Sequence, residues 1–181
     1  MALLILFGLP NLLFAENNRS IPTDFYLIID GSESFRHSRN DAVSWINSQV
    51  VDRLLIDGDR ITIWRAGNSA EIIYSGEVSG AKNEVKNSLS SLAVDASSAD
   101  FSGALIDAHS RVSRTNADRI SYTMLVKASA ENLEGTLTGS VRNLLRWSRS
   151  EKYERWQVLI IGLDIGQRAQ TAATAVMSSL R

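Results

Sequence analysis

Three oxygen-bearing side chains follow a short apolar run near residue 30. The run Phe25–Ile29 is unbroken, and Asp30, Ser32 and Ser34 come after it at alternate positions. Carboxylate and hydroxyl oxygens are the groups that hold hard cations such as Mg²⁺, and they also hydrogen-bond polar ligands. These three residues are therefore the first candidates for a ligand-binding or ion-binding site.

The apolar run predicts the element that positions these side chains. A continuous apolar stretch that ends in an acid is typical of a central strand in a parallel sheet, buried on both faces. In open α/β sheets, ligands bind at the carboxyl ends of the strands. We therefore expect a strand over 24–30 that places Asp30 at its carboxyl end, with Ser32 and Ser34 just beyond it.

The rest of the chain alternates between predicted strands and helices. Helices are expected over 38–55, 80–92, 102–112, 140–147 and 169–180, and strands over 60–65, 70–75, 121–126 and 157–163. The strands 60–65 and 70–75 flank the turn Gly67-Asn68-Ser69, so they should be antiparallel neighbours. This order predicts an α/β fold: a doubly wound, mostly parallel sheet with one antiparallel edge strand and helices on both faces.

The N-terminal residues differ in composition from the rest. Met1–Ala15 is mostly apolar, too short to span a bilayer, and gives way abruptly to polar residues at Glu16, as in a secretory signal peptide. Two features argue against a signal: no Lys or Arg lies near the start, and Leu13 is large for its place before a cut after Ala15. A buried N-terminal helix is the alternative.

We expect a signal peptide over 1–15, a linker over 16–23 and one domain over 24–181. The domain is then secreted or periplasmic, with no stable membrane insertion once the leader is removed. An uncleaved leader that tethers the domain to a membrane is the alternative location.

Composition excludes several function classes. The net charge of −1 gives no electrostatic reason to expect nucleic acid or an anionic membrane surface as a partner. The chain has no cysteine, which rules out disulfides, thiolate zinc sites and cysteine nucleophiles. It has two histidines, so a histidine-rich metal site is not expected.

Four features make the chain similar to a von Willebrand factor A (vWA) domain. The segment Asp30-Gly31-Ser32-Glu33-Ser34 matches that family's Asp-x-Ser-x-Ser motif at the end of the first strand. A long helix and a hairpin over 59–76 follow as they do in the family, and Ala99–Leu105 resembles the segment Thr-Asp-x-x-Gly-Ala-Leu. The remaining strand and helix order also fits, so the resemblance covers Pro22–Arg181.

The resemblance implies a metal-ion-dependent adhesion site. In such a site, three loops at one edge of the sheet hold a divalent cation, and a carboxylate of the partner completes its coordination. Carried over by residue, the metal ligands would be Asp30, Ser32, Ser34 and Asp100, and the cofactor would be Mg²⁺ or Mn²⁺. The partner would be another protein, bound through this loop edge.

The second and third loops depart from the family pattern. The threonine of the second loop falls on Ala99, and the Thr-Asp-Gly of the third loop falls on Lys127-Ala128-Ser129. With one carboxylate fewer and an ammonium nearby, the affinity for Mg²⁺ should fall, so we expect weak or absent metal binding. Asp100 either ligates the ion or caps the following helix. Lys127 is either a solvated loop residue or a replacement for the cation's charge near Asp30.

We therefore expect a non-enzymatic protein-interaction module used for adhesion or scaffolding. The alternative is an α/β serine hydrolase with Ser32 as nucleophile. The sequence disfavours it because Gly31-Ser32-Glu33-Ser34 is not Gly-x-Ser-x-Gly, and no histidine motif near the carboxyl edge offers a base. A nucleotide-binding domain is a third reading, but no glycine-rich phosphate loop is present. The sequence leaves the partner's identity and the oligomeric state open.

Overall fold

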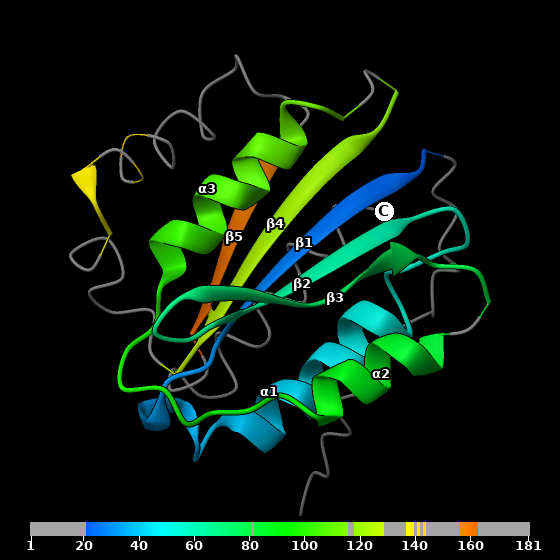
Figure 1. Cartoon of the computed structure of the whole chain (residues 1–181). Helices are drawn as coiled ribbons and strands as arrows, with labels where there is room; N and C mark the ends of the chain where they lie inside the picture. Colours follow the sequence, from blue (N-terminus) through cyan, green and yellow to red (C-terminus); the bar gives the residue numbers. More distant parts are fainter. Residues whose placement is uncertain are drawn as a thin grey trace, which may run out of the picture.

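One five-stranded sheet organises the part of the chain that this computed structural model describes, which is residues 21–80, 82–115, 118–128, 137–139, 141, 143 and 156–162. The strands are β1 (Thr23–Asp30), β2 (Arg60–Ala66), β3 (Ala70–Glu77), β4 (Ile120–Lys127) and β5 (Trp156–Gly162). They lie in the order β3-β2-β1-β4-β5 (Figure 1). The predicted leader and most of the linker fall outside the described residues.

The pairing of the strands confirms the predicted topology. The central strand β1 pairs in parallel with β2 and with β4, and β4 pairs in parallel with β5. The hairpin partner β3 is antiparallel to β2 and lies at one edge of the sheet. The apolar run Phe25–Ile29 is therefore central and buried, as its composition predicts.

Helices cover both faces of the sheet. The helices α1 (Arg39–Trp45), η2 (Ile46–Val51) and α2 (Lys82–Ser90) pack on one face against Phe25, Leu27 and Ile29 of β1. The helix α3 (Phe101–Val112) packs on the other face against Tyr26 and Ile28 (Figure 1). Alternate residues of β1 thus fill two separate cores, which is what a doubly wound sheet requires.

The helix predicted over 38–55 is present over 39–51, but its second half is a π-helix and it ends earlier than predicted. At Ile46 the α-helix gives way to the π-helix η2, where Asp52 N–H donates to the Asn47 carbonyl at 2.9 Å. The wider turn lets two neighbouring pairs, Val50–Val51 and Leu54–Leu55, all reach the core at 2% exposure or less. An α-helical turn of 3.6 residues would rotate one member of each pair further from the sheet.

The other predicted helices are partly tested. The segments predicted over 80–92 and 102–112 form α2 and α3 with small shifts at their ends. The helix predicted over 169–180 and most of that over 140–147 lie outside the described residues. Among the described residues, no helix has the length and apolar character needed to cross a membrane.

Candidate ligand-binding site at the carboxyl edge of the sheet

A pocket of about 230 Å³ lies where β1 and β4 end, at what we call the carboxyl edge of the sheet. This edge pocket is lined by Asp30, Ser32, Ser34, Ser97, Ser98, Ala99, Phe101 and Lys127. The lining comes from the segment after β1, from the loop before α3 with the first residue of α3, and from the end of β4, which are far apart in sequence. The fold thus brings the predicted residues Asp30, Ser32 and Ser34 together with Lys127.

Asp30, Ser32 and Ser34 form a hydrogen-bonded chain of side chains, which we call the hydroxyl relay. The buried carboxylate of Asp30 accepts at Oδ1 from the Ser32 N–H at 2.8 Å and from the Ser32 hydroxyl at 2.6 Å. The hydroxyl oxygens of Ser32 and Ser34 are 2.8 Å apart. Because Ser32 gives its one hydroxyl proton to Asp30, Ser34 must donate to Ser32. The relay therefore ends in the lone pairs of the Ser34 oxygen, which can accept from a donor or bind a cation.

Gly31 lets the loop after β1 lie close against β2. Its N–H donates to the Ala66 carbonyl at 2.8 Å, and its carbonyl accepts from Ala96 N–H at 3.1 Å. A Cβ at this position would lie 2.7 Å from Cγ of Arg65, closer than packed carbon atoms approach. Glycine thus permits the approach that joins this loop to the end of β2 and to Ala96.

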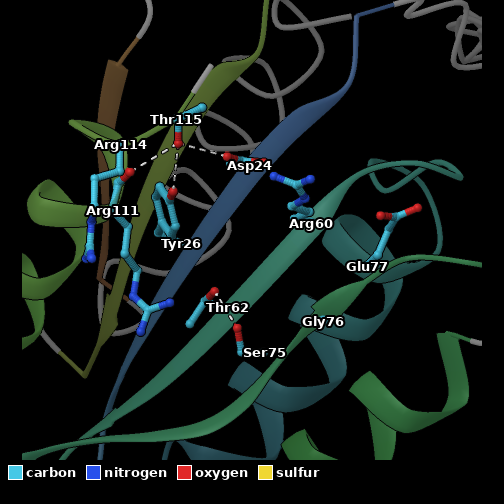
Figure 2. Close-up of a pocket in the computed structure, with 10 residues that line it drawn as sticks. All are labelled: Asp24, Tyr26, Arg60, Thr62, Ser75, Gly76, Glu77, Arg111, Arg114 and Thr115. Carbon is cyan, nitrogen blue, oxygen red and sulfur yellow. Dashed lines mark hydrogen bonds between the residues drawn. The ribbon is translucent and has the colours of Figure 1, made fainter. Parts of the chain in front are cut away.

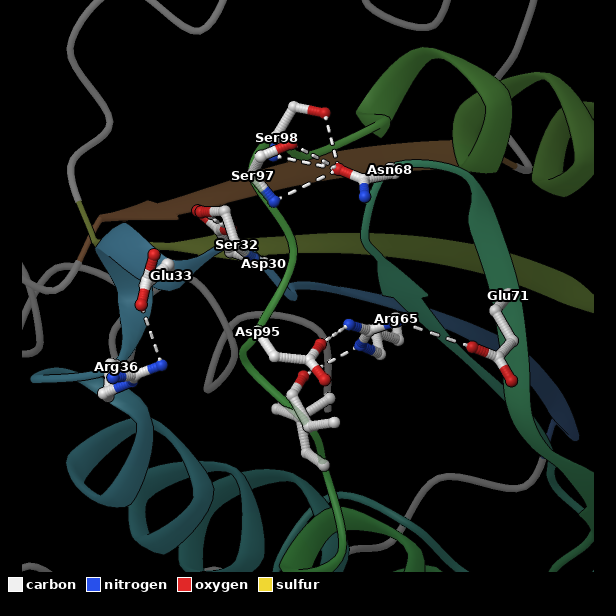
Figure 3. Close-up of polar contacts among 12 residues, drawn as sticks. Asp30, Ser32, Glu33, Arg36, Arg65, Asn68, Glu71, Asp95, Ser97 and Ser98 are labelled. Atoms are coloured by element: carbon white, nitrogen blue, oxygen red, sulfur yellow. Dashed lines mark hydrogen bonds and ion pairs between the residues drawn. The ribbon is translucent and has the colours of Figure 1, made fainter.

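Asn68, in the turn between β2 and β3, holds the loop before α3. Its side-chain carbonyl oxygen faces the N–H groups of Ser97 and Ser98 at 3.1 and 3.2 Å, and their hydroxyls at 2.9 and 3.2 Å (Figure 3). An amide oxygen has two lone pairs, so these four donors share it. The sequence identifies Asn68 only as a turn residue, because its partners lie about thirty residues away.

Arg65 fastens the same loop from the other side. Its guanidinium donates to the Ala93 carbonyl at 2.9 Å, forms an ion pair with Asp95 and approaches Glu71 at 3.6 Å (Figure 3). The Arg65 side chain is 16% exposed, so this planar group is held firmly between β2, β3 and the loop. Sequence reasoning did not single out Arg65, since a charged residue near a strand end gives no distinct signal.

Asp100 is placed differently from the other predicted metal ligands. Its carboxylate accepts from the Gly103 N–H at 2.8 Å and so caps the first turn of α3. Its own N–H donates to the Gly67 carbonyl at 2.8 Å. Asp100 is not among the residues that line the edge pocket, so the geometry matches the capping alternative, and a role as metal ligand stays a prediction.

The charges in the edge pocket fit a divalent cation poorly. Its described lining contains one carboxylate, Asp30, and one ammonium, Lys127. Ala99 and Ala128 stand at the two positions where the vWA pattern has oxygen ligands, and neither side chain can coordinate a metal. Among the described residues, no group of three or more His, Cys, Asp or Glu side chains is placed to hold a metal ion. Mg²⁺ is usually bound through one or two carboxylates, and here the single carboxylate shares the pocket with an ammonium.

A larger pocket of about 620 Å³ opens on the α3 face, near the amino end of β1 (Figure 2). It is lined by Asp24, Tyr26, Arg60, Thr62, Ser75, Gly76, Glu77, Arg111, Arg114 and Thr115. Several of its charges are already engaged: Asp24 pairs with Arg119 at 2.6 Å, and Arg111 reaches Asp107 at 3.3 Å and lies over the Trp64 ring. These contacts join β1 to the residue before β4 and α3 to β2, which is a structural role.

The sequence matches no protein-family model and no curated protein. Its structure, however, is similar to that of a von Willebrand factor type A protein from Catenulispora acidiphila, with a TM-score of 0.58 over 78% of this chain at 15% identity. The chain has the vWA fold. Two further vWA-like structures are manganese-loaded TRAP protein of Plasmodium vivax and proximal thread matrix protein 1 of the mussel byssus with a zinc-occupied MIDAS motif.

These two structures match the chain with similar TM-scores and sequence identities. TRAP gives a TM-score of 0.59 over 88% of this chain at 15% identity, and the thread matrix protein gives 0.56 over 86% at 13% identity. The matched region covers 33% of the Catenulispora chain, 63% of TRAP and 45% of the thread matrix protein. The chain therefore spans less than two thirds of the length of each of these three structures.

Proposed function

We propose that this vWA-fold domain is a non-enzymatic interaction module that binds another protein through the carboxyl edge of its sheet. The observation that carries the proposal is the edge pocket, where the hydroxyl relay, the loop before α3 and Lys127 meet in one concave, polar surface. Binding sites in open α/β sheets form at this edge. The domain acts outside the cytoplasm, in the secreted or periplasmic space to which the leader over 1–15 would direct it.

Divalent metal contributes little to this function in the proposal. The manganese-loaded and zinc-occupied structures with this fold are the reason to expect a cation at the site. Asp30, Ser32 and Ser34 would hold Mg²⁺ or Mn²⁺, and Asp100, whose Oδ1 caps α3, would be a fourth ligand. One carboxylate beside an ammonium supports a Kd of about a millimolar or weaker.

The hydrolase alternative is weaker than the interaction module. A serine nucleophile must give its proton to a base such as histidine, whereas the Ser32 proton goes to the buried carboxylate of Asp30. Neither His37 nor His109 lines the edge pocket. The geometry around Ser32 therefore supports a binding role.

The test is affinity capture from the proteins of the native host, followed by measurement with the purified partner. Ser34→Arg places a long charged side chain at the exposed end of the relay and should abolish capture. Asn83→Arg, an equally exposed change on α2, should leave capture unchanged. Equal capture by wild type and Ser34→Arg would show that the partner binds elsewhere.

A further inference from the structure

We infer that the ammonium of Lys127 takes the place of a divalent cation, so that the edge pocket binds a carboxylate of the partner without metal. This inference rests on the proposed function, because it names the group that the carboxyl edge recognises. It also follows from the poor fit of the pocket to a metal ion.

The strand register places Lys127 next to Asp30. The last registered pair between β1 and β4 is Ile29 with Val126, and Asp30 and Lys127 are the next residue on each strand. Residues opposite each other in neighbouring strands point to the same face of a sheet. The Lys127 side chain therefore leaves the sheet on the same side as Asp30, and both line the edge pocket.

The Lys127 ammonium is available for a ligand. The side chain is half-buried, and within the described part of the chain it makes no ion pair or side-chain hydrogen bond. Asp30 supplies one negative charge in the same pocket, so the pair is neutral overall. A lysine ammonium has three N–H donors.

The hydroxyl relay complements an ammonium. Ser34 donates its hydroxyl proton to Ser32, and Ser32 donates its own to Asp30. The lone pairs of the Ser34 oxygen therefore remain as acceptors in the pocket. An ammonium can donate one hydrogen bond to this oxygen and still have N–H groups for a second acceptor. A carboxylate that enters the pocket would receive those donors, in a charge-assisted hydrogen bond.

A carboxylate suits this pocket better than a phosphate. Lys127 is a single point charge, and Asp30 lies beside it in the lining. A phosphate monoester carries close to two negative charges and three acceptor oxygens, whereas the described lining offers one cation, which matches the single charge of a carboxylate. The pocket of about 230 Å³ has room for the end of an aspartate or glutamate side chain.

The experiment is a nuclear magnetic resonance titration of the full chain, freed of metal with chelator, with sodium acetate at constant ionic strength. Acetate should cause saturable shifts at the Lys127 side chain and at the amides of Ser32 and Ser34. Lys127→Met should remove these shifts. Lys86→Met removes the same charge from α2, where Lys86 pairs with Asp52, and should leave them intact.

Four outcomes of this titration would overturn the inference. Acetate could cause no saturable shift, or the same shifts in Lys127→Met as in wild type. Binding could require Mg²⁺, or inorganic phosphate could bind more tightly than acetate. With the purified partner, Lys127→Met should weaken binding about tenfold, as loss of a partly buried charge contact does. Unchanged partner affinity in Lys127→Met, with capture lost in Ser34→Arg, would contradict the role of Lys127 and leave the proposed function standing.

Discussion

Lys127 lies beside Asp30 where two neighbouring parallel strands end, one position beyond the pair Ile29 and Val126. The strands of a sheet are about 4.8 Å apart. Lys127 and Asp30 carry opposite unit charges in the same pocket, so repulsion of a metal ion by Lys127 opposes its attraction by Asp30. In the proposal, Lys127 together with Ala99 and Ala128 accounts for weak metal binding at this edge pocket.

Asp30 should stabilise the loop after β1 as well as serve the pocket. Its carboxylate accepts two hydrogen bonds from Ser32 while 4% exposed. Asp30→Ala leaves those donors without an acceptor and should lower the free energy of unfolding by about 1.5–3 kcal/mol, measured by urea denaturation. The control Asp118→Ala changes an exposed acid and should stay within about 0.5 kcal/mol of wild type. Equal stabilities for the two variants would contradict this role.

Asn68 should act as a positioning residue for the loop before α3. Asn68→Ala removes the acceptor shared by Ser97 and Ser98. The amides of Ser97 and Ser98 should then exchange with solvent faster by about tenfold, since about 1.4 kcal/mol of local stability is lost. Asn83→Ala on α2 serves as the control. Unchanged exchange at both serines would show that the loop is held without Asn68.

Elements with a local sequence signal could be predicted from the sequence, whereas contacts between distant segments could not. The run Phe25–Ile29 and the turn Gly67-Asn68-Ser69 have local signals, so the central strand and the antiparallel hairpin are confirmed. The contact between Asn68 and Ser97 joins segments 29 residues apart, and no local pattern encodes it. The π-helix at Ile46 was missed because apolar spacing does not distinguish an i→i+5 turn from an α-helix.

The sequence also predicts part of the candidate site: the position of its first loop, but not the role of Asp100. The spacing of Asp30, Ser32 and Ser34 placed them at the strand end, where the structure has them in one pocket. The sequence left two roles open for Asp100, because the same residue types cap helices and bind metals. Its bond to Gly103, a contact within the first turn of α3, is what favours the cap.

Tyr26 should make stability fall at alkaline pH. Burial raises the pKa of its hydroxyl above the ordinary value of 10.0. The folded state therefore keeps its proton longer than the unfolded state, so this contribution is present below pH 10.0 and is lost as pH rises through the folded pKa. In Tyr26→Phe, the decline of unfolding free energy between about pH 9 and pH 11 should be shallower than in wild type. Parallel curves would contradict the assignment to Tyr26.

Restoring the missing oxygen ligands should strengthen metal binding. The double variant Ala99→Thr, Ala128→Asp adds a hydroxyl and a carboxylate at the loops beside the edge pocket. Its melting temperature should rise on addition of Mn²⁺ by more than that of wild type, because a bound ion stabilises the folded state. For wild type, a few millimolar ion should add roughly 1 kcal/mol or less. An equal response in both proteins would mean that the two alanines do not limit affinity.

Calorimetric titration of the metal-free full chain with Mn²⁺ and with Mg²⁺ tests the central claim most directly. The claim is that Lys127 and the single carboxylate Asp30 leave the carboxyl edge largely independent of divalent metal. The expected result is a Kd of about a millimolar or weaker for both ions, which corresponds to about 4 kcal/mol of binding free energy or less. Micromolar binding by the wild-type chain that Asp30→Ala abolishes would contradict the claim and would show that the edge pocket is a working metal site.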